Sequence, residues 1–233
     1  MSNHTFLLTG RSNVLECTLR PPLELNGPHA IGLIDFVAYN SIPNVDESMN
    51  QLVCSDSVNG DRQSITIPIG AYEIDNLQEY LQDRLGGPGH FSMKANNSTL
   101  KVSIKCSRWI HFQMPGTIGP LLGFGSRCLP PNEWHEADKR VDISSVNTIC
   151  VECNVAEGSY MNGESGHVIF TFAPDVEPGF KMVLRPPIVV YYAVTKNVID
   201  RLRVNIVDQR GRPINFGGEE VTVHLHMKPL TNG

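Results

Sequence analysis

Apolar and polar residues alternate in short runs that proline, glycine and asparagine separate. Every second residue is apolar in three runs, residues 100–105, 202–206 and 221–227. Because successive side chains of a β-strand point to opposite faces, this pattern predicts strands with one buried and one solvent-exposed face. Other runs are rich in β-branched and aromatic residues, which is typical of strands. These runs are residues 29–39, 63–67, 148–155, 167–172 and 188–194.

One segment follows a helical period. In residues 73–85 the apolar side chains Ile74, Leu77, Leu81 and Leu85 fall on one helical face, and a glycine-rich stretch follows at 86–89. We expect one amphipathic helix that lies on a β-sandwich. Residues 117–124 are compatible with a second, short helical turn, and the rest of 107–145 has the proline content of a long loop.

The order of these elements predicts the fold class. About ten short strands with turn residues between them are typical of a sandwich or jelly roll, and the βαβ rhythm of a parallel sheet does not appear. The chain is therefore expected to be all-β with one short amphipathic helix. We expect a single jelly-roll β-sandwich or barrel over residues 1–233, with a loop insertion at about 107–145.

Charge and composition narrow the range of partners. The chain has 233 residues, a net charge of -5, and no block of Lys and Arg, so we expect no direct binding of nucleic acid. No run of 18 apolar residues is present, and the start MSNHTFLLTG has no basic region before an apolar one. We therefore expect no membrane span, no signal peptide, and synthesis in the cytoplasm.

Two short motifs raise the question of chemistry. Cys150 and Cys153 form a CxxC, the spacing of a zinc half-site or a redox pair, but they lie in a strand pattern that turns them to opposite faces. His224 and His226 share one strand face, as metal ligands do in cupin enzymes, but no acid follows them. We expect half-buried cysteines, and histidines on a solvent or interface face where protonation would tune a contact. No catalytic, cofactor-binding or metal-binding residue is expected.

A set of segments in order carries a family resemblance. The segments are residues 65–82 (ITIPIGAYEIDNLQEYLQ), 121–124 (LLGF), 146–172, 178–187 (PGFKMVLRPP) and 206–228. Together they resemble the penton-like, single jelly-roll minor capsid proteins of Polinton/Maverick elements and adintoviruses. The resemblance extends over about residues 30–228 and includes no catalytic motif.

The resemblance implies a structural protein of the virion capsid and not an enzyme. It implies an eight-stranded jelly roll that self-assembles into a homopentamer at the vertices of an icosahedral shell, beside a double jelly-roll major capsid protein. Internal or spike proteins are further partners by analogy with pentons, and assembly is expected in the nucleus. Any N-terminal arm is short because a strand pattern starts by Thr5, and the absence of Arg-Gly-Asp gives no support for integrin binding.

A cyclic ring needs two different complementary flanks on each subunit. Candidate contact segments are the loops at 107–145 and 154–166. The candidate interface residues are the aromatic and charged side chains Trp109, Trp134, Glu136, Asp138, Tyr160 and Phe216.

Three other interpretations stay open because fold does not fix function. The chain is alternatively the sole shell protein of a small particle, or a β-sandwich head or spike module that binds a receptor or carbohydrate. The third interpretation is an enzyme of the cupin type. A metal content near zero in the purified protein would exclude it.

Overall fold

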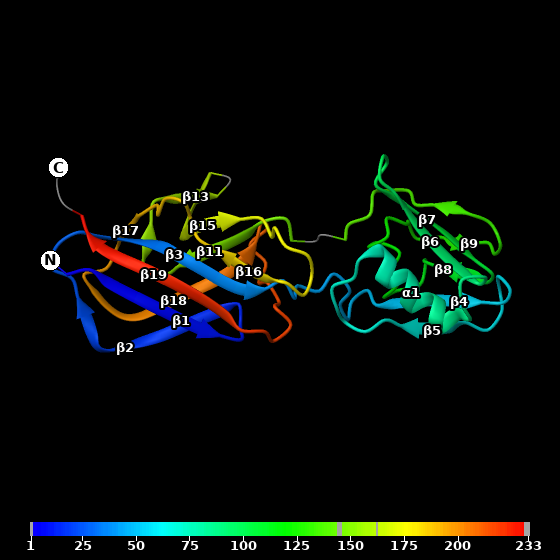
Figure 1. Cartoon of the computed structure of the whole chain (residues 1–233), viewed down its shortest axis with the longest axis horizontal. Helices are drawn as coiled ribbons and strands as arrows, with labels where there is room; N and C mark the ends of the chain where they lie inside the picture. The colour runs from blue at the N-terminus through cyan, green and yellow to red at the C-terminus, as the bar shows by residue number, and fades with distance from the viewer. Residues whose placement is uncertain (1, 144–145, 162, 231–233) are drawn as a thin grey trace. The chain divides into compact units, whose positions relative to one another are not determined.

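The computed structural model describes residues 2–143, 146–161 and 163–230, and the chain forms two compact units. The first combines Met1–Ile42 with Val146–Gly233, and the second is Pro43–Ser145. We call them the jelly-roll unit and the inserted unit. Figure 1 shows that the chain leaves the first unit after β3 (His29–Tyr39) and returns to it before β11 (Ile149–Cys153).

Two antiparallel sheets make up the jelly-roll unit. Sheet 1 has the order β1-β19-β3-β17-β12, and β16 also pairs with β3. Its strands are β1 (His4–Gly10), β19 (Val221–Pro229), β3, β16 (Lys181–Leu184), β17 (Tyr192–Val194) and β12 (Ala156–Glu157). Sheet 2 has the order β15-β11-β18-β2. Its strands are β15 (Val168–Phe172), β11, β18 (Val198–Asp208) and β2 (Val14–Glu24).

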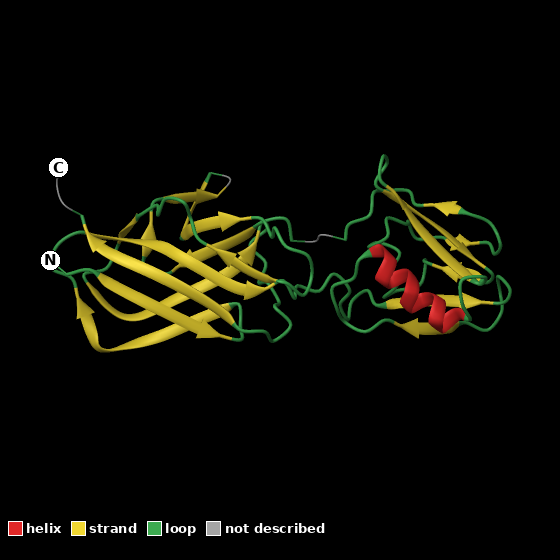
Figure 2. Cartoon of the chain, viewed as in Figure 1, coloured by secondary structure: helices red, strands yellow, loops and turns green. Residues whose placement is uncertain are grey.

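The connectivity of these strands is that of a jelly roll. With β16 and β17 taken as one strand and the short β12 left out, each sheet has four strands. The first strand pairs with the last, β1 with β19, and the second pairs with the one before the last, β2 with β18. Figure 2 shows the two layers of strands. This arrangement confirms the predicted fold class, an all-β jelly roll with one short helix.

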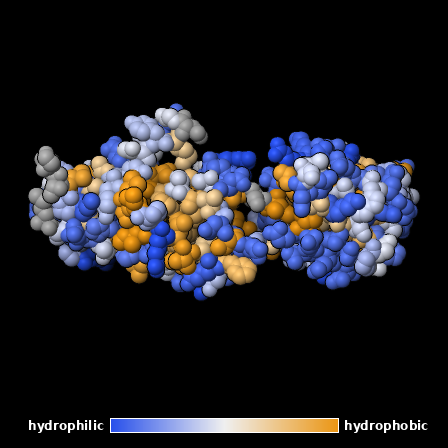
Figure 3. Space-filling view, turned by 45° about the horizontal axis from the view of Figure 1, so that its top comes forward, coloured by the Kyte–Doolittle hydropathy of each residue, from blue (hydrophilic) through white to orange (hydrophobic). Residues whose placement is uncertain are grey.

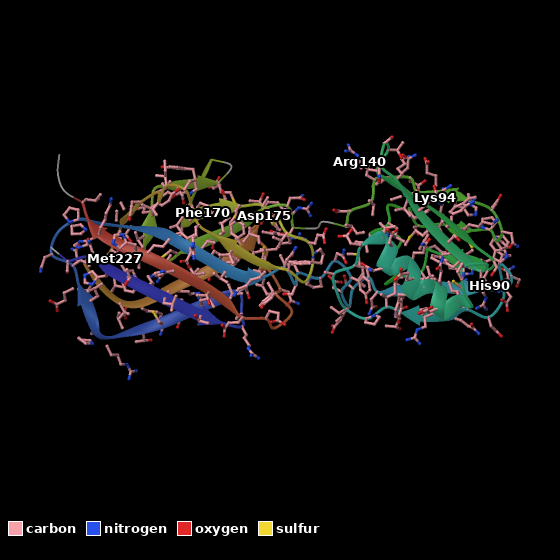
Figure 4. All side chains as sticks on the ribbon, in the orientation of Figure 1. His90, Lys94, Arg140, Phe170, Asp175 and Met227 are labelled. Carbon is pink, nitrogen blue, oxygen red and sulfur yellow. The ribbon has the colours of Figure 1, made fainter. Side chains whose placement is uncertain are left out.

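The core of the jelly-roll unit follows from strict alternation along its strands. In β19 the side chains of Val221, Val223, Leu225 and Met227 are fully buried, and the residues between them are only half-buried. Met227 is labelled on this strand in Figure 4. The inward residues of both sheets form one hydrophobic cluster that contains no residue of the inserted unit. The predicted strand face of residues 221–227 is therefore confirmed.

The inserted unit has two small sheets, one helix and its own core. One sheet has the order β5-β4-β8-β9 and the other β10-β7-β6. The strands are β4 (Gln51–Ser55), β5 (Gln63–Thr66), β6 (Phe91–Asn96), β7 (Lys101–Cys106), β8 (Trp109–His111), β9 (Cys128–Leu129) and β10 (His135–Glu136). The helix is α1 (Ile74–Leu85). A second hydrophobic cluster lies between these elements.

The expectation of one domain with a loop insertion at 107–145 differs from this structure. Residues 107–143 contain β8, β9 and β10, and they bury Ile110, Phe112, Leu122 and Leu129 in the second cluster. The inserted unit therefore begins near residue 43, and its core requires these residues. The expected loop boundary, Ser145, lies outside the described residues. The expected helical turn at 117–124 is a series of turns, closed by bonds such as Phe124 N–H to Gly119 O (2.8 Å).

The helix is confirmed, but its predicted place on the jelly roll is wrong. Leu77 and Leu81 are fully buried in the core of the inserted unit. Two side-chain bonds join α1 to β6: Gln78 Oε1 accepts from the Met93 N–H (2.7 Å) and Gln82 Nε2 donates to Phe91 O (3.0 Å). Gly86 ends the helix with a φ of 96°, a left-handed conformation that favours glycine.

No helix among residues 2–143, 146–161 and 163–230 combines the length and the apolar character that a membrane span requires.

The predicted strand at 188–194 is only partly correct. β17 begins at Tyr192, and residues 188–191, which we call the strap, cross the outer face of sheet 1 instead. A Cβ atom on Gly32 of β3 would lie 2.5 Å from Val190 O and 2.6 Å from Val189 Cγ1. The strap thus lies directly against the sheet at a position where only hydrogen fits. The proline pair that precedes it, Pro186 and Pro187, cannot donate the hydrogen bonds of a sheet ladder.

Candidate functional site

The outer face of sheet 1 carries exposed apolar side chains. Phe36, Ala38 and Met182 point into the core, so Val37, Tyr39 and Val183 point outward. Val183 is 55% exposed, and in the strap Ile188 is 78% and Val190 53% exposed. Figure 3 shows hydrophobic residues gathered on the surface of the jelly-roll unit. We call Val37, Tyr39, Val183, Ile188 and Val190 the apolar patch.

Sheet 2 has a recess on its own outer face. The β13 (Ser159–Met161) and β14 (Glu164–Gly166) strands form a hairpin whose residues line it on one side. β11 and β15 supply the other side, and the volume is about 230 Å³. The lining residues are Thr148, Cys150, Tyr160, Met161, Val168, Thr171 and Gln209. We call this site the hairpin recess.

Two of the predicted interface residues lie in the jelly-roll unit, and they differ in exposure. Tyr160 is 74% exposed on the hairpin and lines the recess. Phe216 is only 4% exposed and packs near Phe36, with ring centroids 6.4 Å apart. The prediction for Phe216 is wrong, because a side chain that the core surrounds is not available to a neighbouring subunit. Its apolar surface stabilises the cluster between the sheets.

The tryptophans lie in the inserted unit. Trp109 is half-buried in β8, opposite Ser55 of β4. Trp134 is 46% exposed, and the Lys94 Nζ lies 4.3 Å from its ring centroid. Lys94, which is labelled in Figure 4, comes from β6. A cation over the face of an indole ring is attracted by the ring's quadrupole, so Lys94 holds Trp134 in place on the surface.

Glu136 and Asp138 have partners within the inserted unit. Lys101 Nζ lies 3.6 Å from Glu136 Oε1, and Arg127 NH1 lies 3.2 Å from Asp138 Oδ1. The backbone N–H of Gly125 donates to Asp138 Oδ2 (2.8 Å), and this bond, with Arg127, lowers the pKa of the carboxyl. Charge reversal at Asp138 would therefore disturb the Gly125–Arg127 turn before it disturbed any contact with another subunit.

The two cysteines of the CxxC occupy opposite faces of β11, as the strand period predicts. Cys153 belongs to the core cluster, and burial raises the pKa of its thiol to about 11. Cys150 lines the hairpin recess, and burial raises the pKa of its thiol too. A high pKa keeps a thiol protonated and unreactive near neutral pH. Both cysteines are therefore small apolar packing residues here.

His224 and His226 both lie on the outer face of sheet 1. His224 Nδ1 is 3.5 Å from Asp35 Oδ2 on β3, and His226 Nδ1 is 2.7 Å from the Tyr191 hydroxyl of the strap. Each imidazole therefore has a different single partner. Within the described ranges there is no group of three or more His, Cys, Asp or Glu side chains placed to hold a metal ion.

A buried Ser–His pair in the inserted unit was missed by the sequence patterns. Ser55 Oγ lies 2.6 Å from His111 Nε2, and both residues are fully buried. Ser55 Oγ also lies 2.6 Å from Ser57 O, which accepts only, so the hydroxyl proton points to Ser57. His111 Nε2 must then carry hydrogen and donate to Ser55.

The other ring nitrogen of His111 completes this assignment. Nδ1 is the acceptor for Gln113 Nε2 (3.1 Å) and Cys128 Sγ (3.4 Å). In this tautomer His111 cannot take the Ser55 proton, so the pair is a structural hydrogen-bond network and not a nucleophile with its base. Ser55 and His111 are 56 residues apart and belong to no short motif, so no sequence signal marked them.

No family model and no curated protein matches the chain. Among solved structures, the chain is similar to the mavirus penton protein, with a TM-score of 0.50 and 8% sequence identity. The alignment covers 98% of this chain and 100% of that protein, so it includes the inserted unit as well as the jelly roll. At this identity the likeness shows a shared fold, and the fold agrees with the connectivity described above.

Proposed function

We propose that this chain is a penton-like capsid subunit that forms homopentamers at the five-fold vertices of an icosahedral shell. The observation that carries the proposal is the nearly complete structural match to a penton protein, which extends over both units. A match to the jelly roll alone would be weak support, because many unrelated proteins use that fold. Here the alignment covers 98% of this chain, so it also includes Pro43–Ser145, the unit inserted between β3 and β11.

The physical role of such a subunit is to fill space and to pair with copies of itself. A jelly roll is a rigid two-sheet body, and a cyclic ring of copies uses heterologous contacts in which one surface meets a different one. The apolar patch and the hairpin recess give the unit distinct features on its two outer faces. Neither surface has a catalytic arrangement, and the role proposed is structural and not enzymatic.

The further partners and the location follow from the same proposal. A penton-like subunit works in the virion, beside a double jelly-roll major capsid protein, with assembly in the nucleus. Its resemblance to the minor capsid proteins of Polinton/Maverick elements and adintoviruses supports this assignment.

Native mass spectrometry of the purified chain tests the proposal. The expected species has five times the 25.8 kDa mass of the chain, and negative-stain images should show five-fold rings. A strictly monomeric protein at high concentration would contradict the proposal. Closed shells formed without a partner would instead identify the sole shell protein of a small particle.

A further inference from the structure

The apolar patch and the hairpin recess lie on opposite sides of one rigid body. The patch is on the outer face of sheet 1, and the recess is on the outer face of sheet 2. The two sheets pack through their inner faces around a single core, so their outer faces point in opposite directions. Two surfaces on opposite sides of one body can contact each other only between two copies. Each copy then presents its patch to one neighbour and its recess to the other.

One surface carries a projecting side chain and the other is hollowed. Ile188 is the most exposed large apolar side chain among the described residues, at 78%, and it projects from a strap that is fixed against Gly32. The recess offers about 230 Å³ lined by Val168, Met161 and the Cys150 thiol. Thr148, Thr171 and Gln209 also line the recess, so it is partly apolar. An exposed apolar side chain on a rigid support and a recess with apolar walls are the two halves of a central interface contact.

The charges around the two surfaces are complementary. Residues 178–194 include Lys181 and Arg185, both exposed, and contain no Asp or Glu. The hairpin region, residues 156–166, includes Glu157 and Glu164, both exposed, and contains no Lys or Arg. Asp35 of β3 also lies on the outer face of sheet 1, where it is paired with His224. Lys181 and Arg185 near the patch, and Glu157 and Glu164 near the recess, then favour contact between unlike surfaces. They disfavour patch-to-patch pairing, since that would bring like charges together.

The area available is that of a specific interface. β3 has eleven residues and lies in a layer four strands wide. At about 3.3 Å per residue and about 4.8 Å per strand, one outer face offers roughly 700 Å². A standard interface buries about 800 Å² on each partner. Interfaces of standard size span about 600–1,000 Å² on each partner, so one sheet face falls near the lower end of this range.

From these features we propose that the apolar patch of one copy binds the hairpin recess of the next, with Ile188 at the centre of the contact. This inference rests on the proposed function and specifies which surfaces close the ring. Lys181 and Arg185 of one copy then face Glu157 and Glu164 of the next. The contact is head-to-tail. A copy with a damaged patch therefore still has an intact recess, and a copy with a damaged recess still has an intact patch.

Three variants test the inference by native mass spectrometry at one fixed concentration. Ile188→Asp places a charge in the patch, and Thr171→Arg fills the recess from β15 with a cation. Each variant alone is expected to be monomeric. Ile69→Asp is the matched control, because Ile69 is 51% exposed but lies in the inserted unit, and it should keep the wild-type oligomer.

Mixing the two damaged proteins gives the decisive result. Each mixed pair has one intact patch and one intact recess, so the expected product is a heterodimer and nothing larger. A mixture that stays monomeric, although both variants keep the wild-type circular dichroism spectrum and melting temperature, would overturn the pairing.

Exchanging the charges of Lys181 and Glu164 tests the charged residues around the contact and leaves Ile188 and the recess unchanged. Lys181→Glu and Glu164→Lys should each reduce the fraction of oligomer, and the double variant, in which every contact again joins opposite charges, should restore it. If wild-type protein is a pentamer and Ile188→Asp leaves it a pentamer, this inference fails while the proposed function stands. If wild-type protein is a monomer, the proposed function fails, and this pairing fails with it.

Discussion

At the scale of single residues, His111 shows how a buried polar group constrains the inserted unit. Both of its ring nitrogens have partners, with Nε2 donating to Ser55 and Nδ1 accepting from Gln113 and Cys128. Burial, together with the nearby Arg62, lowers the pKa of His111. The ring therefore stays neutral in the folded chain at pH values where an exposed histidine has already gained its proton.

This pKa shift predicts that acid destabilises the inserted unit. The unfolded chain binds a proton at His111 as the pH falls below about 6.5, whereas the folded chain binds it only at lower pH. The free energy of unfolding should therefore fall below about pH 6.5, by at most about 1.4 kcal/mol per pH unit for this proton. Above that pH the group contributes no pH dependence, because it is neutral in both states.

Urea unfolding at pH 7.5, 6.5 and 5.5 measures this effect. Both tryptophans of the chain, Trp109 and Trp134, belong to the inserted unit, so their fluorescence reports its unfolding. His111→Gln should be less stable at every pH, but its free energy of unfolding should change less with pH below pH 6.5. Equal slopes for the two proteins would show that another group is responsible.

Gly32 gives a second prediction for a single position. Gly32→Ala would bring a methyl group to 2.5 Å from Val190 O, so the strap must move away from sheet 1. Crowding of this kind costs about 1–3 kcal/mol. We expect a lower melting temperature and faster chymotrypsin cleavage after Tyr191.

Gly166→Ala is the control for this substitution. Its added Cβ atom would meet only Ser159 Oγ, at 3.7 Å, an ordinary contact in the same unit. If Gly32→Ala cleaves no faster than Gly166→Ala, the strap does not depend on close contact with the sheet.

At the scale of elements, long periodic segments were the predictable part of the fold. β18, β19 and α1 agree with the sequence pattern because each has nine or more residues and contains a visible period. β9 and β10 have two residues each, which is too short to show any period. The strap was mistaken for a strand because its apolar residues rest on a sheet without pairing in it.

The place of α1 could not be derived from its own sequence. An amphipathic face specifies only that an apolar surface lies opposite it, and two cores were available. The bonds of Gln78 and Gln82 to β6 bind it to the inserted unit, and these contacts depend on the three-dimensional fold.

The helix provides a test of this core. Leu81→Ala removes a fully buried side chain and should destabilise the inserted unit by about 2–5 kcal/mol. Tryptophan fluorescence should report a lower urea midpoint, whereas Glu79→Ala, an exposed change on the same helix, should leave it nearly unchanged. A Leu81→Ala midpoint equal to that of wild type would show that α1 is not part of the core.

At the scale of the whole molecule, each unit closes its own core. Among the residues that the structure describes, none of 43–143 belongs to the first hydrophobic cluster, and none outside this range belongs to the second. This division is not visible in the amino-acid sequence, because no long linker rich in proline, glycine or serine marks either crossing between the units. Of the candidate interface residues, Tyr160 lines the proposed contact and Phe216 does not. The apolar patch and the recess could not be predicted from the sequence, because each combines residues from strands that are far apart along the chain.

Separate cores predict that the jelly roll folds without the insertion. Ile42 and Val146 both pack against the first cluster, so a short Gly-Ser linker between them should replace residues 43–145. We expect a β-type circular dichroism spectrum and one cooperative melting transition. An aggregated or unfolded product would show that the inserted unit is needed for the jelly roll to form.

The connectivity also determines when the chain can fold as it leaves the ribosome. β1, β2 and β3 are made first, yet β1 pairs with β19, β2 with β18, and β3 with β16, β17 and β19, all after residue 180. At roughly 5–20 residues per second, β3 waits on the order of ten seconds or longer for its first partner. The inserted unit, which has its own hydrophobic core, is fully synthesised within that interval. During synthesis the nascent chain therefore contains a folded inserted unit and three strands that still lack their partners. These unpaired strands expose apolar side chains and free backbone groups, so this is the stage at which chaperones would be most needed.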